Sequence, residues 1–341
     1  MRHRLISLVY TLLSLVAAFA LAAVIIAVSG EDPWQSFQAM FVGAFGDLAA
    51  FGETIVKATP LAISGLAVAL GLHAGLFNIG VEGQLLVGAI VAAWCGYAIS
   101  ASPFLHVPLC LAAGFVAGAL WGLLPGLLKA KRGVHEVITT IMMNYVALYL
   151  THYMVLNPMK DAHTMSPQTP AIHSTAQLPQ IAGTGNIHAG VIVGVLLAVA
   201  FAVFISRTVV GYEMRVVGLS SNAARSSGIN VSKMLLLAML LSGGFAGIGG
   251  AVEVMGVHHK FYDQFSPGYG FDSIAVALLG GATAVSTALS AILFGALRNG
   301  AVTMQLVTDT PKEIVTIIQA IVIVFAGAKF LRGRQSQKRD S

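Results

Sequence analysis

One stretch decides the fold: Gly71-Leu-His-Ala-Gly-Leu-Phe-Asn-Ile-Gly-Val-Glu-Gly-Gln84. Its polar side chains are those of His73, Asn78, Glu82 and Gln84. It separates two apolar runs, residues 61–72 and 85–99, each shorter than the roughly 20 residues that cross a bilayer. Glycine loosens a helix, and non-helical backbone at membrane depth is tolerated only where it packs in protein or lines a wet cavity. The stretch therefore predicts an interrupted helix beside a polar pathway, and an ordinary loop near the membrane surface is the alternative.

The composition is that of a membrane protein. Of 341 residues, 57% are hydrophobic and 10% are charged, and the mean hydropathy is +0.82. A soluble domain has about 25% charged residues, so this chain could not cover its surface in water. The apolar runs are long and do not alternate, which favours helices over a barrel. The two cysteines, Cys95 and Cys110, both lie in apolar runs and form neither a disulfide framework nor a zinc motif.

We predict an all-α polytopic membrane protein with about ten transmembrane helices, some short or interrupted, in one transmembrane domain covering residues 1–341. The predicted spans are residues 6–28, 61–72, 85–99, 108–128, 137–156, 189–205, 234–255, 271–281, 289–305 and 314–329. The other predicted parts are a first span within residues 1–30, an interfacial segment outside (31–58), an outer loop (157–187), a cytoplasmic segment (206–233) and a basic cytoplasmic tail (330–341).

The basic residues predict the orientation. With both termini in the cytoplasm, the outer segments keep only Lys57, Lys160, Lys260 and Lys312, and the inner segments hold almost all other Lys and Arg. Because cytoplasmic loops of membrane proteins carry such an excess, this arrangement is the expected one. The same placement of the charges argues against nucleic acid as the partner of a chain with net charge +5.

Three ionisable residues are predicted at membrane depth: Glu82 in the first break, Glu253 near the outer end of a glycine-rich span, and Arg298 in a later short span. Such charges usually face a bundle interior or a cavity. We expect these three, with Asn78 and Gln84, to line a solute pathway. The alternative is a structural pair of Glu82 or Glu253 with Arg298. A possible internal repeat, residues 66–71 and 274–280, precedes a glycine-containing break in each half.

The segment 206–233 carries helix start and stop signals. Ser221 or Asn222 is a good N-cap, residues 223–227 suit a short helix, and Gly228 is a good stop. This pattern predicts a short helix that docks on a soluble partner, and a plain connector is the alternative. The chain has no phosphate-binding loop and no recognisable nucleophile–base pair, so we expect neither ATP binding by that route nor enzyme activity.

Four motifs carry a family resemblance. They are Gly75-Leu-Phe-Asn-Ile-Gly-Val-Glu-Gly-Gln-Leu-Leu-Val-Gly88, Val134-His-Glu-Val-Ile-Thr-Thr-Ile-Met-Met-Asn-Tyr145, Ala223-Ala-Arg-Ser-Ser-Gly-Ile229 and Gly270-Phe-Asp-Ser-Ile-Ala-Val-Ala-Leu-Leu-Gly-Gly281. The chain resembles integral-membrane permease subunits of ABC importers for simple sugars or nucleosides, in the superfamily of ribose and branched-chain amino acid permeases. That family often has Asn where this chain has His135, which leaves the role of this position open.

The resemblance implies a multi-pass protein of the bacterial plasma (inner) membrane that passes on a nucleoside or simple sugar. It implies three partners: a second homologous permease, a cytoplasmic ABC ATPase and an extracytoplasmic substrate-binding protein. No cofactor or metal is implied, because the ATPase uses the ATP. The implied ATPase-coupling residues are Gly218, Ser221, Asn222, Ala223, Ala224, Arg225 and Gly228. The alternative function is a gradient-driven secondary transporter, in which Glu82 or Glu253 would carry a proton.

Overall fold

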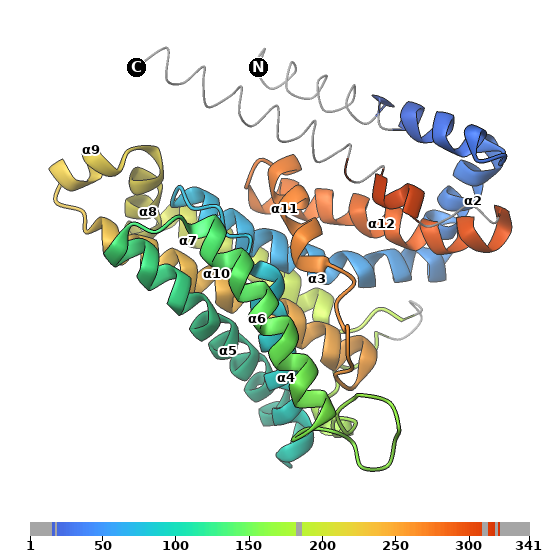
Figure 1. The fold of residues 1–341 in the computed structure, drawn as a ribbon, viewed down its shortest axis with the longest axis horizontal. Coiled ribbons are helices and arrows are strands. Elements are labelled where there is room, and N and C mark those ends of the chain that lie inside the picture. Colours follow the sequence, from blue (N-terminus) through green and yellow to red (C-terminus); the bar gives the residue numbers. More distant parts are fainter. Residues whose placement is uncertain (1–15, 18, 182–185, 309–312, 318–319, 321–341) are drawn as a thin grey trace.

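The computed structural model describes residues 16–17, 19–181, 186–308, 313–317 and 320 (Figure 1). In this part of the chain the regular elements are helices, with isolated β-bridges as the only strand-like pairing. The helices are α2 (Pro33–Phe45), α3 (Leu48–His73), α4 (Val81–Ala98), α5 (Pro103–Arg132), α6 (Glu136–Leu156), η1 (Ser174–Ala176), α7 (Gly190–Arg207), α8 (Val209–Leu219), α9 (Ser221–Ser226), α10 (Val231–Glu253), η2 (Val254–His258), α11 (Tyr269–Leu279) and α12 (Ala284–Thr308). The predicted all-α class is confirmed.

The predicted number of ten spans is not confirmed. Within the described residues, six helices are long and apolar enough to cross a membrane: α3, α4, α5, α7, α10 with η2, and α12. The helix α6 has 21 residues and α11 has 11, but neither belongs to these six. Of the predicted span 6–28, residues 6–15 and 18 lie outside the described residues, and Phe19–Val28 is a short apolar helix. Most of the predicted span 314–329, and all of the tail 330–341, also lie outside the described residues.

The segment 31–58 and the run 61–72 divide differently from our prediction. Asp32 caps α2, and its carboxylate accepts the backbone N–H of Trp34 at 2.8 Å. Residues 48–58 belong to α3, which continues through Pro60 to His73 and has 26 residues. The run 61–72 is therefore part of a full-length helix. Inside α3 the Lys57 ammonium donates to Asn299 Oδ1 at 2.9 Å.

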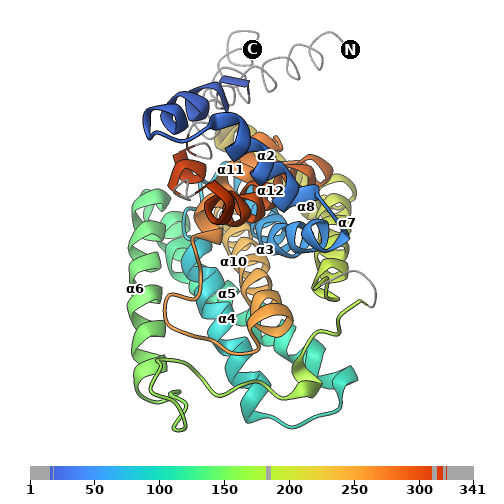
Figure 2. The same ribbon diagram turned by 90° about the vertical axis from the view of Figure 1, so that its right-hand side faces the viewer.

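Helix α10 is the centre of the bundle and packs on α3, α4 and α5 (Figure 2). Glycines make these contacts close. A Cβ on Gly247 would lie 3.0 Å from the carbonyl carbon of Gly114 and 3.1 Å from the Cα of Gly118. Real Cβ atoms rarely come so near to backbone. Small residues at such spacing let helix backbones approach each other, as the glycine-rich sequence predicted.

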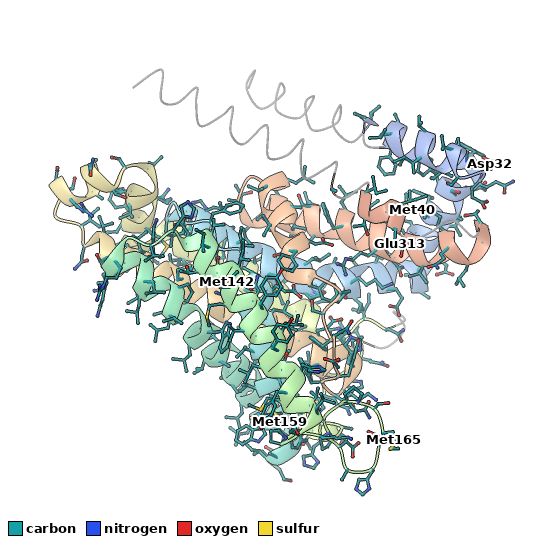
Figure 3. All side chains as sticks on the ribbon, viewed as in Figure 1. Asp32, Met40, Met142, Met159, Met165 and Glu313 are labelled. Carbon is teal, nitrogen blue, oxygen red and sulfur yellow. The ribbon has the colours of Figure 1, made fainter. Side chains whose placement is uncertain are left out.

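The two long polar segments lie at opposite ends of the molecule. The loop 157–187, which carries Met159 and Met165, is at one end, and α8 and α9 are at the other (Figures 1 and 3). The end of α3 reaches the connection between α11 and α12, where His73 Nε2 lies 3.0 Å from the carbonyl oxygen of Ala282. The two stretches predicted as breaks are therefore in contact at this point.

Candidate solute pathway and coupling segment

The chain between α3 and α4, residues 74–80, is a connection in which buried and more accessible residues alternate, and we call it the break. Ala74, Leu76 and Asn78 are at most 2% exposed. The break joins two helices, each long and apolar enough to cross a membrane by itself, so the predicted single interrupted helix is wrong. The part of the prediction that holds is a non-helical connection packed inside protein.

Asn78 and Gln84 hold the break in place. Asn78 Nδ2 donates to Gln84 Oε1 at 2.9 Å and to Ser242 Oγ at 2.8 Å, and Asn78 Oδ1 accepts the N–H of Gly80 at 2.9 Å. The Ser242 hydroxyl donates in turn to the carbonyl oxygen of Ala67 at 2.7 Å. All three side chains are buried and satisfied by one another. Their contacts are those of a structural network that fixes the loop.

A further buried amide, that of Asn144 on α6, was not singled out from the sequence. Asn144 Oδ1 accepts the N–H of Gly83, and Asn144 Nδ2 donates to the carbonyl oxygen of Ile79, both at 2.9 Å. Asn144 thereby ties α6 to the start of α4. It lies within one of the four quoted motifs, but nothing in the spacing tells which amide in the chain will reach the break.

The charged candidates gather around the start of α11. Glu82 accepts the N–H of Gly270 at 2.6 Å, where the first N–H groups of a helix favour an anion. Glu253 Oε1 accepts the hydroxyl of Tyr269 at 3.2 Å. Arg298 lies over the Tyr269 ring, with its guanidinium carbon 4.7 Å from the ring centroid. The structure therefore brings Glu82, Glu253 and Arg298 to one element.

The acid that pairs with Arg298 is neither Glu82 nor Glu253. Arg298 donates from Nη2 at 2.8 Å and from Nε at 3.0 Å to Asp272 Oδ2. It also donates to the carbonyl oxygen of Pro267 at 3.0 Å. The two alternative structural pairs of the sequence analysis are therefore wrong. Asp272 lies one helical turn into α11, and sequence separation alone did not indicate which acid would reach Arg298.

A cavity of about 620 Å³ lies between α4, α6 and the segment before α11, and we call it the α4–α6 cavity. Its lining combines aromatic rings with polar groups: Ile79, Glu82, Leu86, Ile141, Asn144, Tyr145, Leu148, Tyr149, His152, Asp263, Gln264, Ser266, Gly268 and Phe271. Of the five predicted pathway residues, only Glu82 lines it. The wall is completed by a contact of His152 Nδ1 with Asp263 Oδ1 at 2.9 Å. Apolar surface with a few convergent polar groups is typical of small-molecule sites.

The coupling segment, residues 206–233, contains two short helices. Helix α9 begins at Ser221, two residues before the predicted helix 223–227, because Ser220 is the N-cap and its hydroxyl accepts the N–H of Ala223 at 3.3 Å. Gly228 follows it with φ +79°, so the predicted stop signal is confirmed. Ser221, Asn222 and Arg225 are exposed. Ala224 is fully buried against α8 and α10, which was not predicted.

The coupling segment touches the break directly. Gly218 lies on α8, and a Cβ placed on it would be 2.9 Å from the backbone N of Gly75 and 3.0 Å from the carbonyl carbon of His73. No side chain separates the two backbones at this point. Gly75 has φ +76°, a conformation that glycine adopts without strain. The segment predicted to dock on a soluble partner is thus one contact away from the loop that carries Asn78.

The chain matches one known protein family over most of its length. Residues 50–327 match the family model described as "Branched-chain amino acid transport system / permease component". The chain belongs to this family of permease components. No solved structure matches it significantly.

Among curated relatives, this permease is 42% identical to the guanosine ABC transporter permease protein NupP of Bacillus subtilis, over 99% of each chain. It is 34% identical to the nucleoside ABC transporter permease protein NupB of Lactococcus lactis, over 94% of this chain and 90% of the relative. It is 37% identical to the glucose ABC transporter permease protein TsgB13 of Haloferax volcanii, over 92% and 85%. The resemblance found in the sequence motifs is confirmed.

Proposed function

We propose that this permease is the membrane subunit of an ATP-driven importer and that its solute is a nucleoside. The observation that carries the proposal is the α4–α6 cavity, in which three exposed rings face polar groups. Tyr145 and Tyr149 on α6 and Phe271 on α11 supply the rings, and a purine base can stack on them. Glu82, Gln264 and Ser266 supply acceptors and donors for hydroxyl groups. The names of the guanosine and nucleoside relatives support the same solute class.

The open side of the cavity supports a second permease as partner. Large apolar and aromatic side chains of α6 outside the cavity lining are exposed, and we call them the α6 face: Ile138, Met142 and Tyr153. Figure 3 shows Met142 on this helix. A polar pathway cannot open to lipid, because unsatisfied polar groups in hydrocarbon cost several kcal/mol each. A homologous subunit packed on the α6 face would close the cavity and supply its other wall.

The two ends of the molecule suit the other two partners. The exposed side chains of α9 would bind a cytoplasmic ATPase, which would move the coupling segment. The loop 157–187, at the opposite end, would bind an extracytoplasmic binding protein. The basic-residue bias supports this orientation, with both termini in the cytoplasm. Glu253 and Arg298 lie behind the segment that lines the cavity, and they support the pathway from there.

The test is uptake of labelled guanosine into vesicles that contain the purified complex of permeases, ATPase and binding protein. We expect uptake that requires ATP and persists without an ion gradient. Uptake that follows an imposed proton or sodium gradient without ATP would overturn the ATP-driven importer in favour of a secondary transporter. ATP-dependent uptake of glucose but not of guanosine would overturn the solute class alone.

A further inference from the structure

A second, smaller cavity lies behind the segment that walls the α4–α6 cavity. It has a volume of about 220 Å³, and we call it the Glu253 cavity. Its lining includes Glu53 and Lys57 of α3, Glu253 of α10, Tyr262 and Gln264. Gln264 lines both cavities, so the segment around it separates them. The Glu253 cavity is about a third of the size of its neighbour and is lined by a much more polar set of side chains.

Glu253 has an acceptor atom that the protein leaves free. The side chain is 3% exposed. Its Oε1 accepts the Tyr269 hydroxyl at 3.2 Å and lies 3.4 Å from His258 Nε2. Its Oε2 is buried and has no hydrogen-bond partner among the described residues. A buried carboxylate oxygen without a donor is costly, so a hydrogen-bond donor that reaches Glu253 from the cavity would be stabilised.

The same cavity offers donors. An ammonium group has three N–H donors, and Lys57 Nζ uses one of them on Asn299 Oδ1 at 2.9 Å. The hydroxyl of Tyr262 and the amide of Gln264 also line the space. A ligand that enters here thus meets a carboxylate acceptor on α10 and an ammonium donor on α3.

This mixture of charges selects the chemistry of the ligand. Lys57 in the wall opposes a metal ion or an organic cation. The carboxylates of Glu53 and Glu253 oppose an anion. A neutral ligand that both donates and accepts remains. Adjacent hydroxyl groups do this, because their O–H groups donate to a carboxylate while their oxygens accept from an ammonium.

The geometry points to a subsite in the Glu253 cavity for a vicinal diol, such as the 2′,3′-hydroxyls of a ribose. The site deepens the proposed function and rests on it for the nucleoside, because Gln264 lines both this cavity and the aromatic α4–α6 cavity.

The test measures ribose binding directly, by saturation-transfer NMR on the purified full complex without its binding protein. The probes are D-ribose and guanosine at millimolar concentration, because a pathway site binds weakly. We expect saturation transfer to the ribose H2 and H3 protons in the wild type. We expect at least a fivefold loss in Glu253→Gln, which puts an amide donor where the acceptor was, and in Lys57→Met. The matched control is Glu313→Gln, which changes an exposed carboxylate.

The outcomes separate this inference from the proposed function. The melting temperature of each variant shows that it is folded, and two variants on different helices guard against the failure of one. Absence of ribose signal in the wild type, or full signal in both folded variants, overturns the subsite even where ATP-driven guanosine uptake is found. Loss of ribose signal in the variants, with no ATP-driven guanosine uptake by the wild type, supports the subsite and overturns the proposed solute.

Discussion

Gly218 on α8 lies against Gly75 in the break, backbone to backbone: a Cβ on Gly75 would be 3.1 Å from the Cα of Gly218. The coupling segment and the loop before Glu82 are therefore in direct contact. Packed backbones do not deform gradually, so a shift of α8 displaces the loop as a unit. We propose that movement at the surface of α9 is passed to the α4–α6 cavity through this contact and through the network of Asn78.

The first prediction tests that contact. Gly218→Ala places a methyl group into the backbone of His73 and Gly75 and should push α8 away from the break. We expect the ATPase to bind and hydrolyse ATP while guanosine uptake falls about tenfold, equivalent to about 1.4 kcal/mol of coupling free energy. The measurement is the ratio of guanosine taken up to ATP hydrolysed. Gly194→Ala is the matched control, because its Cβ would meet only ordinary contacts at 3.7 Å.

The second prediction concerns docking of the ATPase. Asn222 is exposed on α9, so Asn222→Trp should block docking by steric overlap without disturbing the bundle. We expect loss of the ATPase on co-purification. Ala224 is unsuitable for this test, because its burial means that a larger side chain would disrupt α8, α9 and α10 themselves. Ser174→Trp, at the opposite end, serves as the control, and retention of the ATPase by Asn222→Trp would contradict the assignment.

The third prediction concerns orientation. Ser174, in the loop 157–187, and Ser221, on α9, are both exposed, and these two segments lie at opposite ends of the molecule (Figure 1). Each is replaced by Cys in a background without Cys95 and Cys110, and intact cells are treated with an impermeant thiol reagent. Where there is an outer envelope, it is permeabilised first. We expect labelling of Ser174→Cys alone. Labelling of Ser221→Cys from outside would reverse the orientation and remove the coupling segment from the cytoplasm.

The fourth prediction separates structural charge from pathway charge. Asp272→Asn removes the partner of the half-buried Arg298, so the free energy of unfolding should fall, and Arg298→Met in the same chain should restore part of it. We expect a coupling energy of about 1–3 kcal/mol in the double-mutant cycle. Glu82→Gln should instead lower uptake with little change in melting temperature. A coupling between Glu82 and Arg298 as large as that between Asp272 and Arg298 would contradict this division.

The fifth prediction concerns pH. Burial lowers the pKa of His188, and nearby Glu253 opposes only part of that shift. Because the unfolded chain then binds a proton more readily than the folded one, stability should be complete above the ordinary histidine pKa of about 6.5 and should fall as the pH drops below it. We expect a smaller loss of melting temperature between pH 7.5 and 5.5 in His188→Asn. Asn can keep the bond that Nδ1 accepts from the N–H of Gly190. An equal loss in both proteins would show that His188 does not contribute.

Local signals were read correctly from the sequence, and long-range partners were not. The glycine stop at Gly228, the close packing of the glycine-rich α10 and the break before Glu82 depend on a few neighbouring residues, whose types restrict the backbone directly. The pairing of Arg298 with Asp272 depends on how α11 lies against α12, which no single stretch specifies. The hydrogen bond of Lys57 with Asn299 could not be predicted either, because the two residues are 242 positions apart in the sequence.

The same dependence on long-range packing explains why most residues that line the α4–α6 cavity were not predicted. Asn78 and Gln84 were chosen as polar side chains near a break, and such side chains can satisfy one another as well as face a solute. The aromatic residues that line the cavity, Tyr145 and Tyr149, look in sequence like any apolar stripe of a membrane helix. Only the packing of α4 beside α6 shows which residues of α6 line the cavity.

The central claim is that a nucleoside passes through the α4–α6 cavity during ATP-driven transport. It is tested most directly by Tyr149→Cys in the chain without Cys95 and Cys110, with the rate of thiol labelling measured in the working complex. The account predicts that guanosine and ATP together slow labelling at this position, while labelling of Ser174→Cys is unchanged. A labelling rate at Tyr149→Cys that is the same with and without guanosine, in a complex that still takes up guanosine, would contradict it.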